Sequence, residues 1–75
     1  MAKLPVCSGA DAIQAFERAG WLRKSQKGSH VTLIKSGALV VLTVPLHREF
    51  GPGLLRSLIR KAGMTVEEFV ELLNA

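Results

Sequence analysis

The fold of this chain is decided by residues 30–44, which read HVTLIKSGALVVLTV. Two segments rich in β-branched residues, His30–Lys35 and Leu39–Val44, flank the short connection Ser36-Gly37-Ala38. This pattern predicts two antiparallel strands joined by a connection of hairpin type. Pro45 ends the second strand, because proline lacks the N–H group that a strand ladder requires.

The segment before this pair predicts a further strand at the edge of the sheet. Residues Trp21–Gln26 mix charged and apolar side chains, as exposed edge strands do, and Lys27-Gly28 then gives a turn signal. The sequence therefore predicts a three-stranded antiparallel meander. Trp21 could stack on a nucleic-acid base, but its position directly after a helix end favours a partly buried packing role.

A helix is expected before the sheet. Ser8 provides a cap, Asp11 lies in the first turn, and Gly20 supplies a left-handed stop, so this helix runs to about Ala19. Its apolar residues recur at helical spacing and form one stripe.

Two more helices are expected after the sheet. Gly51-Pro52-Gly53 opens the first, and Gly63 ends it. Thr65 and Glu68 form a capping box at the start of a last, short helix. The order of helix, three strands, helix and helix predicts an α+β fold.

Composition fits a single domain over residues 1–75. With 48% apolar residues and a mean hydropathy of +0.26, the chain is too apolar to be a disordered linker, and it is too short for two cores. The single cysteine, Cys7, excludes an internal disulfide and a zinc module, so a reducing cytoplasm fits best. No apolar run approaches the roughly 20 residues of a membrane span.

The charge of the chain favours a polyanionic partner. Ten Lys or Arg against six Asp or Glu give a net charge of +4, and residues 1–63 hold all ten basic side chains. They are not gathered on one long amphipathic helix, so nucleic acid is a better candidate than a membrane surface.

Several basic side chains could track a phosphate backbone. Arg56 and Arg60 stand four residues apart on one helix face, after a Gly-Pro-Gly turn whose backbone N–H groups could cradle a phosphate. A solvated helix face is the simpler interpretation of that pair taken alone. The residues predicted to bind nucleic acid are Lys24, Lys27, Lys35, Arg56, Arg60 and Lys61.

Histidines are the remaining candidates for chemistry, since no P-loop, paired carboxylates or nucleophile elbow is present. His30 lies at a turn into a strand, on the same face as Thr32 and Ile34. By position alone it is more often a surface residue without a role. His47 lies in a loop, where bonds to nearby backbone or to Glu49 favour a structural role, and it is a secondary site candidate.

The ordered set of motifs resembles the HicA-like toxins of bacterial and archaeal toxin–antitoxin pairs. The resemblance covers nearly the whole chain. The matching segments are Leu4-Pro5, Ser8-Gly9, AFERAGW at 15–21, QKGSHV at 26–31, VPLH at 44–47, GLLRSLIRKAGMT at 53–65 and EEF at 67–69.

This resemblance implies a double-stranded-RNA-binding-domain-like fold that acts as a ribosome-independent mRNA endonuclease and is held inactive by a HicB antitoxin. The essential histidine of the family corresponds to His30, and Gly28 and Ser29 match the rest of its motif. The small residues would let an RNA backbone approach closely. At Ser36-Gly37-Ala38 and Leu39 the sequence departs from common members, which usually have an Asp-Gly type of turn.

RNA supplies its own nucleophile, the 2′-hydroxyl group, so the protein need only position the backbone and move protons. His30 could act as general base on that hydroxyl or as general acid on the leaving oxygen, while Lys27, Arg56 or Arg60 offsets phosphate charge. No cluster of metal ligands is visible, so cleavage without a metal or cofactor is expected. The alternative is a non-catalytic double-stranded-RNA-binding or adaptor module with the same basic face.

Overall fold

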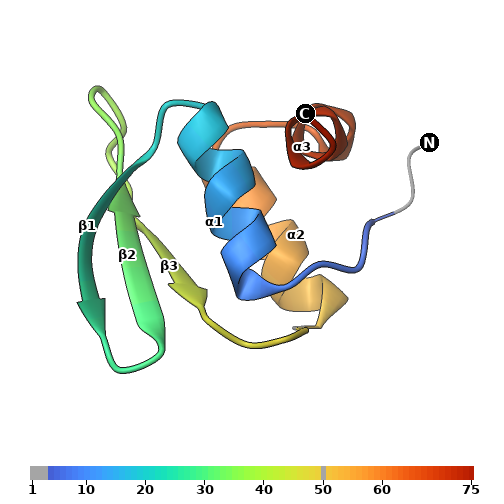
Figure 1. Cartoon of the computed structure of the whole chain (residues 1–75). Helices are drawn as coiled ribbons and strands as arrows, with labels where there is room; N and C mark the ends of the chain where they lie inside the picture. Colours follow the sequence, from blue (N-terminus) through green and yellow to red (C-terminus); the bar gives the residue numbers. More distant parts are fainter. Residues whose placement is uncertain (1–3, 50) are drawn as a thin grey trace.

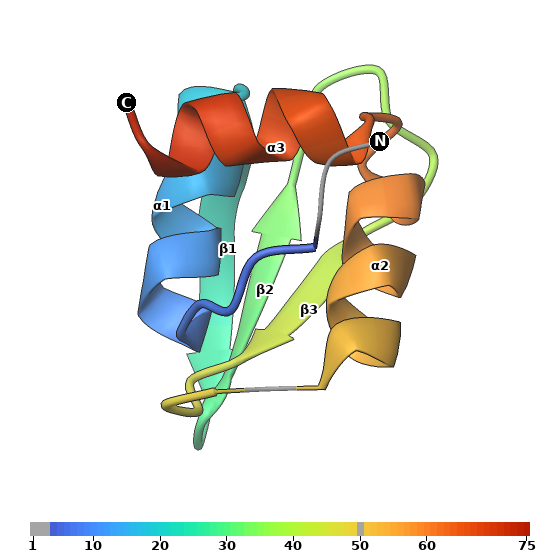
Figure 2. The same ribbon diagram turned by 90° about the vertical axis from the view of Figure 1, so that its right-hand side faces the viewer.

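The computed structural model describes residues 4–49 and 51–75. Its elements follow the predicted order: α1 (Gly9–Arg18), β1 (Leu22–Lys27), β2 (His30–Ile34), β3 (Leu42–Pro45), α2 (Pro52–Lys61) and α3 (Val66–Leu73). Helices α1 and α2 cover one face of the sheet, and α3 crosses their ends (Figure 1, Figure 2). The predicted α+β fold, similar to double-stranded-RNA-binding domains, is confirmed.

The three strands form an antiparallel meander in the order β1-β2-β3. Along β2, Val31 and Leu33 are fully buried against the helices, whereas His30 is exposed on the outer face of the sheet. The alternation follows from the period of two along a strand. The edge strand β1 is exposed along its whole length and carries a register shift between Arg23 and Ser25, features that discourage pairing with another sheet.

The third strand begins later than the sequence predicts, at Leu42 instead of Leu39. Lys35 and Ala38 close a turn through an N–H···O bond of 3.1 Å, and Gly37 holds a φ of +86° at its third position. These are the features of a type II turn. A type II turn drives the two flanking strands apart, whereas the type I′ and II′ turns of tight hairpins match the twist of paired strands. The chain therefore leaves the ladder, and the segment before Leu42 becomes an exposed loop.

Hydrophobic side chains from every element except β1 fill the space between the sheet and the helices. Phe16 of α1 and Phe69 of α3 pack with ring centres 5.2 Å apart, which attaches the last helix to the first. Trp21 is only 2% exposed, so the packing role is confirmed and base stacking is excluded. The buried core comprises Cys7, Ala12, Ile13, Ala15, Phe16, Trp21, Val31, Leu33, Leu42, Val44, Leu55, Leu58, Ile59 and Phe69.

The helix ends agree with the sequence. Ser8 Oγ accepts a bond from the Asp11 N–H at the start of α1, and the predicted capping box at the start of α3 is present. Gly20 and Gly63 follow the ends of α1 and α2, as expected. None of the helices in residues 4–49 and 51–75 is long and apolar enough to cross a membrane.

Candidate active site

His30 is the first residue of β2 and stands at the end of the sheet where β1 turns back. It pairs with Lys27 of β1 on one side and with Pro45 of β3 on the other, so its backbone is held between two strands. Its side chain is exposed on the outer face of the sheet. This arrangement gives an accessible imidazole on a rigid base, as a group that moves protons on a bound substrate requires.

The turn that leads into His30 consists of Gly28 and Ser29. Lys27 pairs directly with His30, and Gly28 holds a φ of +60° while no non-glycine residue described has a positive φ. A positive φ at the first central position only is the mark of a type II′ turn, which requires glycine there. A Cβ at Gly28 would meet no atom within 4 Å, so the turn also leaves open space beside His30.

His47 lies in the loop after β3, and backbone bonds hold this loop from two sides. The Leu46 N–H donates to the Ser29 carbonyl oxygen at 2.6 Å, and the Gly9 N–H donates to the His47 carbonyl oxygen at 2.8 Å. Among residues 4–49 and 51–75, the His47 side chain makes no bond to nearby backbone or to Glu49, the structural role that the sequence favoured. The His47 carbonyl group instead contacts α1. The His47 imidazole, in contrast, is exposed.

The structure brings the two imidazoles together. The ring centres of His30 and His47 are 6.5 Å apart, and the planes are inclined by 68°. Sequence reasoning treated the two histidines separately, because 16 intervening positions give no sign that they meet. Two features of the sequence were the available clues, the turn signal at Lys27–His30 and the end of the third strand at Pro45. In an antiparallel meander, the turn between the first two strands lies beside the end of the third strand.

The residues predicted to bind nucleic acid lie at several separate places on the molecule. Lys27 lies beside His30, whereas Lys35 follows the far end of β2 and there lines one pocket together with Lys61. Arg56 and Arg60 are exposed on α2, and Lys24 is exposed on β1. Of these six residues, Lys27 is the one that strand pairing places directly beside His30.

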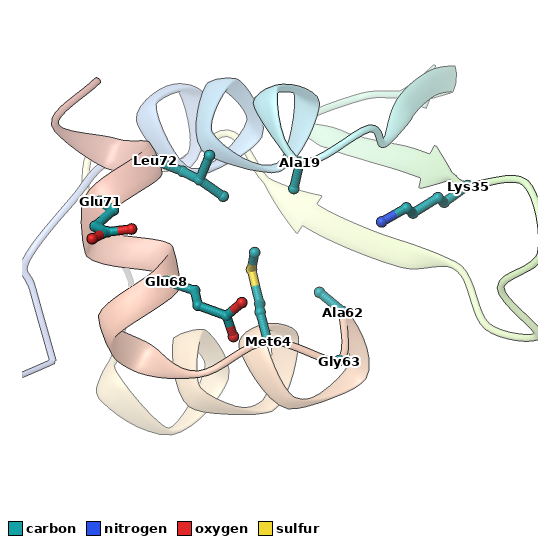
Figure 3. Close-up of a pocket in the computed structure, with 8 residues that line it drawn as sticks. All are labelled: Ala19, Lys35, Ala62, Gly63, Met64, Glu68, Glu71 and Leu72. Carbon is teal, nitrogen blue, oxygen red and sulfur yellow. The ribbon is translucent and has the colours of Figure 1, made fainter.

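A pocket of about 340 Å³ lies at the end of the molecule remote from His30, between α3 and the ends of α1 and α2 (Figure 3). The Lys35 ammonium group points toward it, and Glu68 lies at its α3 wall. Glu68 Oε1 already accepts a bond of 2.8 Å from the Thr65 N–H. This acidic group therefore caps the helix, and neither histidine lines the pocket.

Cys7 is a buried thiol next to α1. Burial raises the pKa of Cys7, and the negative charge of Asp11 adds to the effect. Since the thiolate is the reactive form, this thiol is poorly suited to act as a nucleophile near neutral pH.

Nothing in the described segments, 4–49 and 51–75, gathers three or more His, Cys, Asp or Glu side chains into a potential metal site. A comparison with individually curated proteins gave no match. The family model described as HicA toxin of bacterial toxin–antitoxin matches residues 9–64, which include β1, β2, β3 and α2 as well as both histidines.

Proposed function

Because the chain belongs to the HicA toxin family of bacterial toxin–antitoxin systems, it is a toxin, and we propose that it is a metal-independent endoribonuclease that cleaves mRNA with His30 as general acid or base. The single observation that carries the proposal is the exposed side chain of His30, whose backbone is held between two strands beside the Gly28-Ser29 turn. The family is generally of the ribonuclease type.

Cleavage of RNA by its own 2′-hydroxyl group requires few functional groups from the protein. The 2′-hydroxyl group of RNA attacks the adjacent phosphorus, so the protein supplies orientation, proton transfer and a positive charge near the phosphate. His30 supplies the proton transfer, and Lys27, its cross-strand neighbour, supplies the charge. The products are a 2′,3′-cyclic phosphate and a 5′-hydroxyl end.

The toxin requires an antitoxin partner, and we propose that this partner is a HicB protein acting in the cytoplasm, where mRNA is the substrate. The +4 net charge supports an anionic partner surface as well as an RNA substrate, because both would be attracted to the same basic body.

The test incubates the purified protein with a long mRNA in EDTA and maps the new ends. The His30→Ala variant should lose about 10²- to 10⁴-fold in cleavage rate, the usual contribution of general acid–base catalysis. Thr32→Ala, two residues further along the same outer face of β2, is the matched control and should cleave normally. Addition of a HicB antitoxin should suppress cleavage.

Equal cleavage by the wild-type and His30→Ala proteins would remove His30 from the mechanism. A strict requirement for a divalent ion would contradict metal independence. If neither protein cleaves but both bind RNA with a steep salt dependence, the chain is a binding module instead.

A further inference from the structure

His47 stands beside His30 at a distance that suits a shared substrate. With ring centres 6.5 Å apart, the imidazoles do not bond to each other, and no hydrogen bond to any other described residue engages either ring. A catalytic hydrogen bond spans about 2.6–3.2 Å, so two imidazoles this close can each reach a different oxygen of one phosphate that is bound over the pair.

The position of His47 is fixed by its backbone and not by its side chain. Gly9 and Ser29 hold the loop from α1 and from the β1–β2 turn, as described above. A Cβ at Gly9 would collide with the Pro45 carbonyl oxygen and come within 2.9 Å of the Pro45 carbonyl carbon, so α1 and this loop are in direct backbone contact. Backbone bonds therefore hold the loop so that the exposed imidazole lies near His30, and the imidazole itself is not needed for these bonds.

We propose that His47 is a second catalytic residue and that His30 and His47 act as an acid–base couple on one phosphodiester. This inference rests on the proposed ribonuclease function. Phosphoryl transfer places the attacking and leaving oxygens roughly in line on opposite sides of phosphorus. Two imidazoles that each reach one of these oxygens can serve both at once, which one imidazole cannot do.

The proton and electron balance is complete without a further reagent. The neutral imidazole of the couple takes the proton of the 2′-hydroxyl group while that oxygen forms its bond to phosphorus. The bond from phosphorus to the 5′-oxygen breaks, its electron pair goes to that oxygen, and the protonated imidazole donates a proton there. Each imidazole ends in the opposite protonation state, and exchange with water restores both.

The couple requires one neutral and one protonated imidazole, so the cleavage rate should rise and then fall with pH. Other charged groups near the pair are Lys27 on β1 and Arg48 and Glu49 in the loop beyond His47. Lysine, arginine and glutamate side chains ordinarily change charge outside the range of about pH 5 to 8, whereas histidine side chains change charge within it. The two limbs of the profile are therefore assigned to the two histidines.

The experiment measures the pH dependence of cleavage for wild type, His30→Ala, His47→Ala and the control Arg48→Ala, with thermal unfolding of each. Each histidine variant should lose about 10²- to 10⁴-fold, should lose one limb of the profile, and should unfold at the wild-type temperature. Because the bond from Gly9 goes to the backbone oxygen of His47, His47→Ala leaves it in place. Arg48→Ala should retain both limbs.

A second substrate separates the two roles. In an RNA whose 5′-oxygen at the cleaved bond is replaced by sulfur, the leaving group departs without a proton. This RNA should restore cleavage to the variant that lacks the acid and not to the one that lacks the base. If His47→Ala cleaves like wild type with both limbs intact, or if the sulfur restores both variants or neither, the couple is wrong. If the wild-type protein itself cleaves no RNA, the proposed function fails first.

Discussion

Gly9 is the residue at which the fold and the candidate site depend on the same contact. Its N–H group bonds to the His47 carbonyl oxygen, and its Cα packs against the backbone of Pro45. Any side chain there must push α1 away from the loop that carries His47. Although alanine is ordinarily favoured over glycine within a helix, at this position the close approach outweighs helix propensity.

We therefore expect Gly9→Ala to destabilise the protein by about 1–3 kcal/mol, the usual cost of overpacking. The matched control is Gly53→Ala in the first turn of α2, where a Cβ would meet nothing within 4 Å. That variant should be unchanged or more stable by up to about 1 kcal/mol. Urea unfolding measures both. Equal stability of the two variants would mean that the α1–loop contact is not tight.

The residues around the candidate site differ in how well their placement could be predicted from the sequence. The strand alternation placed His30 on one face with Thr32 and Ile34, and the composition of the preceding segment predicted the Gly28 turn. The choice of His30 as the catalytic candidate came from the resemblance to the HicA-like toxins. The proximity of His47 was not predicted, because it depends on the register that pairs His30 with Pro45 and on loop contacts with Ser29 and Gly9, which are far apart in sequence. No local pattern reports such a contact.

At the scale of elements, α3 depends on its capping box. Thr65 and Glu68 exchange bonds of 3.1 and 2.8 Å, which satisfy two backbone N–H groups at the helix start. The helix is short, so its stability comes from this cap and from packing through Phe69.

Glu67 and Glu68 make a matched pair for testing the cap, because both lie in the first turn of α3 and only Glu68 belongs to the box. Glu68→Ala should lower the free energy of unfolding by about 1 kcal/mol, as loss of a capping bond usually does. Glu67→Ala should cost less, since it removes only an interaction with the helix dipole. Thermal unfolding compares them; equal losses would show that charge and not the reciprocal bond stabilises the helix start.

The helices and strands differ in how closely the sequence predicted their bounds. Helix starts and stops were predicted closely because caps and glycines are local signals. The start of β3 was placed too early, since the β-branched run at 39–41 has strand propensity but follows a type II turn. The turn type depends on which central position of the turn carries glycine. A type II′ turn needs glycine at the first central position, and Gly37 occupies the second.

At the scale of the whole molecule, Lys27 lies at the end of the sheet that carries His30 and His47, whereas Lys61 lines a pocket near the opposite end. If RNA lies across the His30 end, Lys27 contacts phosphate and the distant Lys61 does not. In a His30→Ala background, chosen because the proposed mechanism expects it not to cleave, Lys27→Ala should weaken RNA binding and reduce the slope of log affinity against log salt by about 0.7. Lys61→Ala should leave the slope unchanged. Titrations at several salt concentrations test this, and equal slopes would place the RNA elsewhere.

The pairing of Phe16 with Phe69 also bears on the synthesis of the toxin. His30 and His47 both precede α2, but the core that supports the sheet includes Phe69 of α3, near the end of the chain. A small domain of this kind folds as a unit. A nascent chain that already contains both histidines therefore still lacks Phe69 and with it part of the core. If the proposed function holds, the toxin becomes active only after its last helix has been made and has packed on α1.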